Sequence, residues 1–142
     1  MFSGTECILT TKDFQILQSL LDERTPFGDP LARLLRAKLS SPHLVLPADV
    51  PPDVATLYSR VQFSADDGPS AVRTLIRDEA YGIPGGSLPI TNMRGLALLG
   101  LGAGRSIAVP DPGGVAETLR METVLYQPEA AQRWRAGTVR VS

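Results

Sequence analysis

Cysteine and histidine are almost missing from this chain of 142 residues, which contains one of each. Cys7 therefore has no internal partner for a disulfide, and no cysteine cluster exists to hold zinc. His43 lies between Pro42 and Leu44, and the sequence assigns it no nucleophile and no second metal ligand. These scarcities exclude a disulfide-stabilised fold and a Cys/His metal site, and we expect no metal and no cofactor.

Long hydrophobic runs and an excess of charge of one sign are also missing. No apolar run approaches the ~20 residues that span a bilayer, and the N-terminus lacks the basic start and apolar stretch of a signal peptide. We therefore expect a soluble cytoplasmic protein. The formal net charge of −1 provides no global field to attract nucleic acid. A direct DNA contact would have to come from the tail with Arg133, Arg135 and Arg140, and such a short basic tail is typical of a solvated end.

Familiar catalytic motifs are absent from the sequence. The string nearest to a Gly-x-Ser-x-Gly elbow, residues 85–89, has proline in place of the last glycine. Residues 100–105 (Gly-Leu-Gly-Ala-Gly-Arg) look like a dinucleotide-binding loop, but they end in arginine and follow a predicted helix where that loop needs a strand. These glycines suit the end of a helix and a turn into the next strand. We therefore expect that the protein is not an enzyme.

Two amphipathic helices are predicted in the first third of the chain. Thr10 to Asp13 form a start that resembles a capping box, and apolar residues then recur at helical spacing to about Arg24. Asp29 and Pro30 are a strong N-cap and first-turn pair for a second helix that ends before Pro42. Joined by a short loop, the two helices should form an antiparallel hairpin.

The hydrophobic pattern changes to a period of two after the proline-rich residues 42–53, which we predict to be a linker. We expect a helix from Met93 to Leu101, capped by Asn92, and a short helix or frayed end after Glu129. Because predicted strands outnumber helices here, the sequence predicts an α+β domain with an antiparallel sheet. The predicted organisation is a helical hairpin at 1–41, the linker, and the α+β domain at 54–142. Strands are expected at residues 57–64, 71–77, 87–91, 106–109 and 118–126.

A series of short strings runs through residues 51–131. It comprises Ser-Arg-Val at 59–61, Gly-Leu-Ala-Leu-Leu-Gly at 95–100, Pro-Gly-Gly at 112–114 and Val-Leu-Tyr-Gln-Pro-Glu-Ala-Ala at 124–131. In this order the strings resemble the C-terminal domain of the family that comprises GreA, GreB and Rnk, the regulator of nucleoside diphosphate kinase. The ordered series is far more specific than any one string.

The resemblance implies an FKBP-like sheet wrapped against one helix. It also implies docking on bacterial RNA polymerase at the rim of the secondary channel, through which nucleotides enter. The protein would then contact nucleic acid only indirectly, through the polymerase. We also expect it to be a monomer. The candidates for polymerase contacts are the residues at the family's motif positions, namely Ser59, Asn92, Met93, Arg94, Gly95, Arg105, Pro112 and Gly113.

The length of the predicted hairpin distinguishes two modes of action within this family. In Gre factors a long coiled coil passes down the channel, and acids at its tip help to hold the Mg²⁺ ion that cleaves backtracked RNA, whereas Rnk-like proteins carry a shorter hairpin. Asp22, Glu23 and Asp29 bracket the predicted loop in this chain. The first helix would span ~20 Å at 1.5 Å per residue, about half of a Gre-type coiled coil. These acids should therefore stop short of the polymerase centre, and we expect regulation of elongation without RNA cleavage.

Two departures from the family pattern concern the expected partner surface. Asn92, Met93 and Arg94 stand where the family usually has Ser-Pro, and Arg94 brings a positive charge to the less favourable end of the helix dipole. Arg105 replaces the usual aspartate after the glycine turn. Two other functions stay open, because a fold does not determine a function. One is a stand-alone protein-interaction module, and the other is an FKBP-like peptidyl-prolyl isomerase, against which the aromatic content of only 6% argues.

Overall fold

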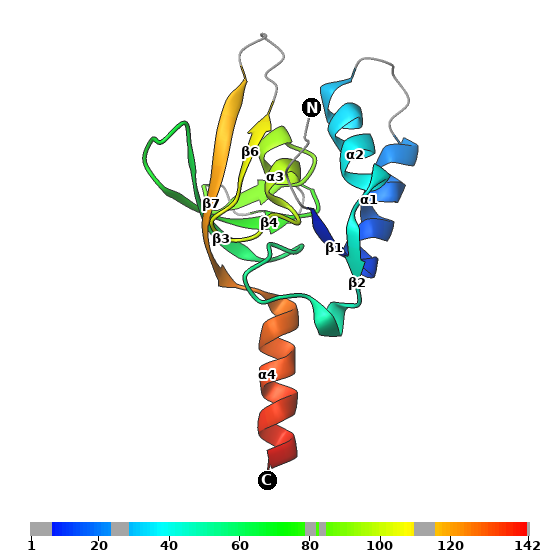
Figure 1. Cartoon of the computed structure of the whole chain (residues 1–142), viewed down its shortest axis with the longest axis vertical. Coiled ribbons are helices and arrows are strands. Elements are labelled where there is room, and N and C mark those ends of the chain that lie inside the picture. The colour runs from blue at the N-terminus through cyan, green and yellow to red at the C-terminus, as the bar shows by residue number, and fades with distance from the viewer. Residues whose placement is uncertain (1–6, 24–28, 79–81, 83–84, 110–115, 142) are drawn as a thin grey trace.

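The computed structural model describes residues 7–23, 29–78, 82, 85–109 and 116–141, the last six through their backbone alone. Figure 1 shows a sheet beside a group of helices, with a C-terminal helix that projects from one end. The elements follow each other as β1 (Ile8–Thr10), α1 (Thr11–Glu23), α2 (Pro30–Ser40), β2 (His43–Val45), the short 3₁₀ helix η1 (Pro47–Asp49), β3 (Arg60–Ala65), β4 (Ala71–Ile76), β5 (Ser87–Pro89), α3 (Met93–Leu98), β6 (Ser106–Val109), β7 (Glu117–Tyr126) and α4 (Pro128–Val141).

Five strands form the main sheet in the order β5-β4-β3-β7-β6. β3 pairs antiparallel with β4 and β7, and β7 pairs antiparallel with β6. β5 runs parallel to β4, with Thr74 beside Ser87. The predicted α+β class is confirmed, but the expectation of a purely antiparallel sheet is wrong. The connection between β4 and β5 is long enough for the chain to turn back to Thr74 and run in the same direction as β4, which a tight hairpin turn cannot allow.

Two of the element boundaries that differ from the predictions do so for the same reason. β3 begins at Arg60, because Thr56 to Ser59 form a turn in which the Ser59 N–H donates to the Thr56 carbonyl at 2.9 Å. α3 ends at Leu98, because Leu99 has an extended backbone and Gly100 has a φ of 84°. Before β3 and after α3, apolar side chains of the adjoining turn also fill the core. The hydrophobic pattern therefore predicts a longer strand and a longer helix than the structure contains.

A second sheet lies in a region for which no strand was predicted. β1 and β2 pair in parallel, from Ile8 beside His43 to Thr10 beside Val45. β2 and η1 occupy the proline-rich residues 42–53, which were predicted to be a linker. Three residues per strand are too few to produce a recognisable alternation. β1 is also joined to the rest of the fold, because the Ile8 N–H donates to the Gly100 carbonyl at 3.0 Å.

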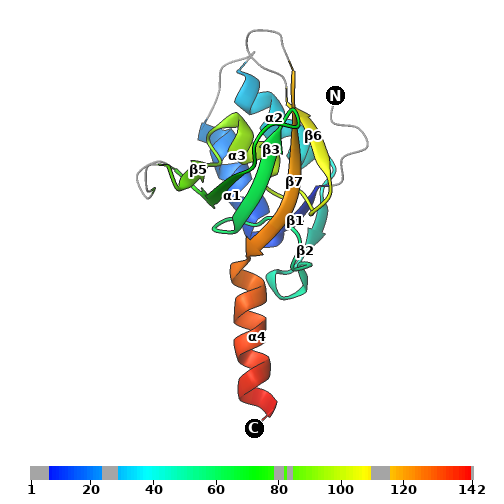
Figure 2. The same cartoon turned by 90° about the vertical axis from the view of Figure 1, so that its left-hand side faces the viewer.

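One hydrophobic cluster contains side chains from the helices and from the main sheet. Figure 2 shows β3 and β7 in front of α1, α2 and α3, and Figure 1 shows the same arrangement from the side, so the helices cover one face of the sheet. The division into hairpin, linker and domain stays a prediction, but the core runs across it. The cluster's most deeply buried members include Leu17, Leu34, Leu35, Val61, Leu75, Leu96, Leu98, Leu119 and Met121, each at most 1% exposed.

Hydrogen bonds join the start of the C-terminal helix α4 to residues 47–54. The side-chain amide of Gln127 donates to the carbonyls of Pro51 and Val54, both at 2.7 Å. The guanidinium of Arg133 donates to the carbonyls of Pro47 in η1, at 3.1 Å, and of Val50 just after it, at 2.8 Å. The expected short helix or frayed end is thus a helix of 14 residues. Arg133, expected in a solvated tail, instead anchors this helix to the body of the protein.

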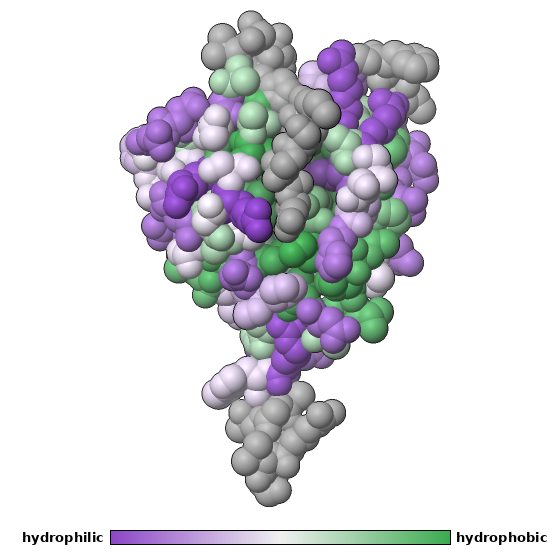
Figure 3. All heavy atoms as spheres, in the orientation of Figure 1, coloured by the Kyte–Doolittle hydropathy of each residue, from purple (hydrophilic) through white to green (hydrophobic). Residues whose placement is uncertain are grey.

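The surface differs in character from one side to the other. Figure 3 shows hydrophobic residues over β2, where Leu44 and Leu46 are 46% and 59% exposed, and hydrophilic residues on the opposite flank near the turn between β3 and β4. Among the helices of the described ranges, none has the length and apolar character needed to cross a membrane.

Gly95 lets α3 lie directly on the strand before it, and its replacement tests this packing. A Cβ at this position would lie 2.1 Å from the Pro89 carbonyl oxygen, a backbone atom that cannot rotate away. We expect Gly95→Ala to lower the free energy of unfolding by about 3 kcal/mol, measured by denaturant titration. In the matched variant Gly102→Ala the new Cβ would lie 3.8 Å from its nearest neighbour, and the change should stay below about 1 kcal/mol. Equal losses in the two variants would contradict the close contact.

Candidate partner-binding site

The start of α3 is an exposed N-cap. Asn92 has an extended backbone, with φ −98° and ψ 145°, and its side-chain oxygen accepts a hydrogen bond from the Arg94 N–H at 2.9 Å. Asparagine suits this position because its short amide satisfies a helix N–H that has no partner within the helix. The prediction that Asn92 caps α3 is confirmed.

Arg94 is paired, which removes the conflict with the helix dipole that the sequence suggested. Its Nε donates to Glu117 Oε2 and its terminal nitrogen donates to Glu117 Oε1, each at 2.7 Å. These hydrogen bonds raise the pKa of Arg94 above its usual value. The Arg94 side chain is 47% exposed and that of Glu117 is 26% exposed, so the pair contributes little to stability but holds the guanidinium in one orientation.

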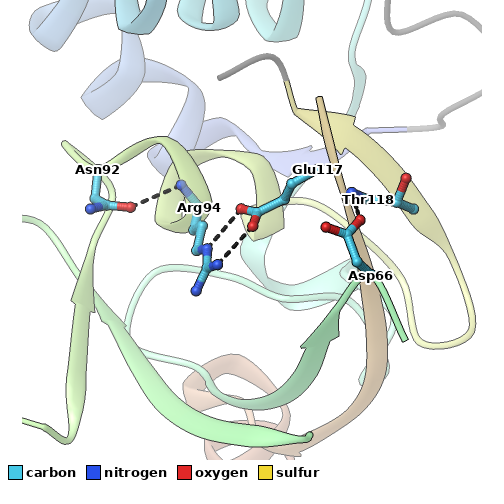
Figure 4. Close-up of polar contacts among 5 residues, drawn as sticks. All are labelled: Asp66, Asn92, Arg94, Glu117 and Thr118. Carbon is cyan, nitrogen blue, oxygen red and sulfur yellow. Dashed lines mark hydrogen bonds and ion pairs between the residues drawn. The ribbon is translucent and has the colours of Figure 1, made fainter. Parts of the chain in front are cut away.

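The turn between β3 and β4 brings a second carboxylate to the same region. Asp66 Oδ1 accepts a hydrogen bond from the Thr118 N–H at 2.8 Å, one residue beyond Glu117. Figure 4 shows the Asp66 carboxylate, from the turn after β3, on the same side as the Glu117 carboxylate of β7, with the Arg94 guanidinium against Glu117. We call the group Asn92, Arg94, Glu117 and Asp66 the α3 cap patch. Its polar and charged groups are held in fixed orientations at the surface.

The other predicted contact residues separate into surface and interior positions. Met93 is half-buried at the first position of α3, and Arg105 is exposed. Arg105 precedes β6, whose far end carries Val109 beside Glu117, so roughly 13 Å of strand at 3.3 Å per residue separates Arg105 from the α3 cap patch. Pro112 and Gly113 lie outside the described residues.

Ser59 and Gly95 face the interior of the protein. Ser59 is 0% exposed, and its hydroxyl accepts from the Thr56 N–H at 2.9 Å. Gly95 is buried against Pro89, as described above. Neither residue has surface available for a direct contact, and both shape the backbone that carries the exposed candidates.

The predicted tip acids lie at the ends of two helices. Asp22 and Glu23 are exposed in the last turn of α1. Asp29 is the N-cap of α2, as predicted, and its Oδ1 accepts from the Leu31 N–H at 3.1 Å. Within the described ranges, no group of three or more His, Cys, Asp or Glu side chains is arranged to hold a metal ion.

Lys38 is a buried residue for which no role was predicted. Its ammonium donates to the carbonyls of Ala97 at 3.0 Å and Leu99 at 2.6 Å, and it lies 3.9 Å from the Cys7 sulfur. Burial lowers the pKa of Lys38. A cation suits the C-terminal end of a helix, where carbonyls lack partners. A signal was present in the sequence, because Lys38 continues the apolar stripe of Leu31, Leu34 and Leu35.

Asp13 is the second buried charge. The capping-box pattern predicted that its carboxylate turns back to the start of α1, but its Oδ2 accepts from the Leu57 N–H at 3.1 Å. Thr10 does cap the helix, because its hydroxyl accepts from the Asp13 N–H at 3.0 Å. Burial, the largest cause, raises the pKa of Asp13 to about 6, and the nearby Glu129 carboxylate adds to this shift. Asp13 thus joins α1 to the turn before β3.

Comparison with known proteins identifies the class to which this fold belongs. Residues covering 85% of the chain superpose on 98% of a solved structure described as prokaryotic transcription elongation factor GreA/GreB from Nitrosomonas europaea, with a TM-score of 0.65 and 30% sequence identity. The mixed α+β fold of this chain is therefore similar to that of a Gre-type transcription factor. No protein-family profile matches the sequence.

The particular family follows from two curated relatives. The proteins named "Regulator of nucleoside diphosphate kinase" from Escherichia coli strain K12 and from Shigella flexneri are each 38% identical to this chain over 125 residues. Each match covers 87% of this chain and 92% of the relative. The chain belongs to the family of the regulators of nucleoside diphosphate kinase, which confirms the resemblance found in the sequence.

The raised pKa of Asp13 predicts a pH dependence of stability. Because the folded-state pKa of about 6 lies above the ordinary value of 3.8, folding favours the protonated carboxyl. The stability that the protonated Asp13 carboxyl contributes is complete below pH 4 and is lost as the pH rises through 6. The shift corresponds to about 3 kcal/mol. Asp13→Asn stays neutral and can still accept from Leu57, so it should remove this loss and be more stable than the unchanged protein at pH 7.5.

Denaturant unfolding at pH 4 to 8 measures this effect. The matched variant Asp22→Asn changes an exposed carboxylate at the other end of α1 and should keep the pH profile of the unchanged protein. If Asp13→Asn retained the decline in stability between pH 4 and pH 7, the assignment to Asp13 would be wrong.

Proposed function

We propose that this protein regulates transcription elongation by binding bacterial RNA polymerase at the rim of the secondary channel, where it competes with Gre-type factors. The observation that carries the proposal is the similarity to a GreA/GreB elongation factor over 85% of the chain, at 30% identity and a TM-score of 0.65. The membership in the family of regulators supports a regulatory, non-catalytic role.

The α3 cap patch is the part of the proposed polymerase contact that the described residues support best. It occupies the position of the family's motif before the Gly-x-Ala-Leu-Leu-Gly helix, and its Arg94 guanidinium is exposed and held by two hydrogen bonds. A side chain that is already ordered loses less conformational freedom on binding than a mobile one. Arg105 lies apart from this patch and would form a separate contact.

The helix lengths favour regulation without RNA cleavage. α1 has 13 residues and α2 has 11, which correspond to ~20 and ~17 Å at 1.5 Å per residue. Asp22 and Glu23 in the last turn of α1 would therefore stay far from the polymerase centre. In the proposed mode, the two helices occupy only the entrance of the channel, and the acids do not position a metal ion there.

A second candidate function is a direct effect on nucleoside diphosphate kinase, because the curated relatives bear the name of that enzyme's regulator. Pull-down of purified nucleoside diphosphate kinase beside core RNA polymerase separates this candidate from the first. The FKBP-like nature of residues 54–142 remains part of the proposal, and it does not require isomerase activity.

Reversal of one charge tests the polymerase contact. The unchanged protein should bind purified core RNA polymerase at low salt, and Arg94→Glu should weaken binding at least tenfold, because it breaks the pair with Glu117 and places a third acid in the patch. Biolayer interferometry measures both affinities, and an added GreA-type factor should displace the bound protein.

Arg120→Glu is the matched control for this experiment. Arg120 is an exposed arginine of β7 outside the α3 cap patch, and its reversal should change the affinity less than threefold. Thermal melting should show that both variants are folded. Absence of binding by the folded, unchanged protein would overturn the proposed function, and equal affinities of the two variants would exclude the patch as the contact.

An RNA cleavage assay tests the second part of the proposal. Backtracked elongation complexes incubated with this protein and Mg²⁺ should release no more RNA fragment than complexes incubated alone, because the short helices keep the acids away from the polymerase centre. A Gre factor serves as the positive control. Stimulated cleavage that Asp22→Asn or Glu23→Gln reduces would contradict the proposed mode of action.

A further inference from the structure

A pocket of about 510 Å³ lies on the outer face of the main sheet, away from the helices. Its floor is formed by Val72, Thr74 and Ile76 of β4. These residues alternate with Leu75, which is buried in the core, so they face the opposite side of the sheet. Figure 2 shows this face of β3 and β5 toward the viewer. The volume is within the range of small-molecule sites, about 300–1,000 Å³.

Tyr58 forms one wall of the pocket in an unusual backbone conformation. Its φ is 70°, in the left-handed region that bulky side chains rarely adopt. The conformation is imposed by the turn, because the Tyr58 N–H donates to the Leu75 carbonyl at 2.7 Å and the Ser59 N–H closes the turn on Thr56. Asparagine or glycine would adopt this φ more easily. Tyr58 is 44% exposed, so packing in the core does not explain a tyrosine here.

Arg60 supplies the charge of the pocket. It is the charged residue among the described residues that line it, and within those residues no hydrogen bond or ion pair engages its guanidinium. Its neighbours in register are Thr74 and Tyr126, neither of which carries a negative charge. On the same face, the Glu122 carboxylate accepts hydrogen bonds from Gln62 and Ser70. As far as the described residues show, the guanidinium is thus available to an anion.

The wall opposite Tyr58 exposes backbone. Gly85 and Gly86 lie at the edge of the pocket before Ser87. Gly85 has a φ of 79°, and no atom beyond its own and its two neighbouring residues lies within 4 Å of the place where a Cβ would be. A ligand can therefore approach the main chain here without meeting a side chain.

We propose that this pocket binds a small ligand that combines a flat ring with an anionic group. The ring packs on the Tyr58 ring, and the anion accepts hydrogen bonds from the Arg60 guanidinium. Two kinds of compound share this chemistry, namely nucleoside phosphates and aromatic carboxylates. The site is separate from the α3 cap patch, so ligand binding here does not depend on the proposed polymerase contact.

Titration of the isolated full-length protein, followed by amide NMR shifts, tests the site. The two ligand arms are the four ribonucleoside 5′-monophosphates and indole-3-acetate, and the arm that binds identifies the source. Adenosine, which lacks the anion, and inorganic phosphate, which lacks the ring, should bind at least tenfold more weakly. Shifts should concentrate at Tyr58, Arg60 and Gly86.

Two variants separate binding from folding. Arg60→Gln should weaken binding at least tenfold. Tyr58→Asn should do the same while its melting temperature stays equal or rises, because asparagine tolerates the left-handed conformation. Arg36→Gln, an exposed arginine of α2, should bind as the unchanged protein does.

Three results would overturn the proposal. The first is the absence of shifts in the pocket at millimolar concentrations of every probe. The second is unchanged binding in Arg60→Gln and Tyr58→Asn. The third is a lower melting temperature of Tyr58→Asn, which would show that the ring serves the fold. No polymerase is present in these titrations, so their outcome does not depend on the proposed function.

Discussion

The arrangement of the helices against the sheet depends on the buried ammonium of Lys38. A charged group without partners inside a protein is strongly destabilising, and Lys38 avoids this cost only where α2 lies next to the end of α3. There its ammonium meets the carbonyl of Ala97 at the end of α3 and that of Leu99 just after it, where a helix leaves carbonyls without a partner of its own. A displaced α2 would leave both the cation and the two carbonyls unsatisfied. The interaction therefore determines where α1 and α2 lie against the sheet, which the non-directional packing of leucines alone does not.

A second constraint comes from the turn at residues 56–59, on which three parts of the molecule converge. Asp13 of α1 accepts from the Leu57 N–H, and Thr56 donates to Glu129 in the first turn of α4 at 2.7 Å. The same turn places Tyr58 in its left-handed conformation at the pocket. One short segment thus positions the first helix, the last helix and the wall of a surface site. Its polar groups are buried but hydrogen-bonded, which is the condition under which such groups can remain inside a protein.

The two proposed binding surfaces use different means to present a guanidinium. Arg94 is oriented by Glu117, whereas Arg60 meets no acid among the described residues of its pocket. A paired arginine adds geometric specificity to a protein contact, while an arginine without a partner can neutralise a small anion. Both are carried by the main sheet or by the helix packed on it, so neither surface depends on the exposed ends of α1 and α2. This separation would allow a small ligand and a large partner to bind at the same time.

Local chemistry made several features predictable from the sequence. Asp29 and Asn92 were recognised as caps because a cap involves residues two positions apart. β6 was predicted with its observed bounds, and small exposed residues alternate with buried branched ones in it. The pair of Arg94 with Glu117 spans 23 positions, and the contacts of Lys38 span about 60. The parallel β1 and β2 were missed because three residues show no period.

The amino-acid sequence by itself determined the α+β class, the family and the caps, because these follow from neighbouring residues and from an ordered series of motifs. Only the tertiary structure decided that Ser59 and Gly95 face the interior, that Arg94 is neutralised, and that β5 runs parallel to β4. It also decided that Tyr58 and Arg60 line one pocket. The physical reason is common to all of these features, since burial, ion pairing and strand direction depend on residues that are distant in the chain and become neighbours only when the core has formed.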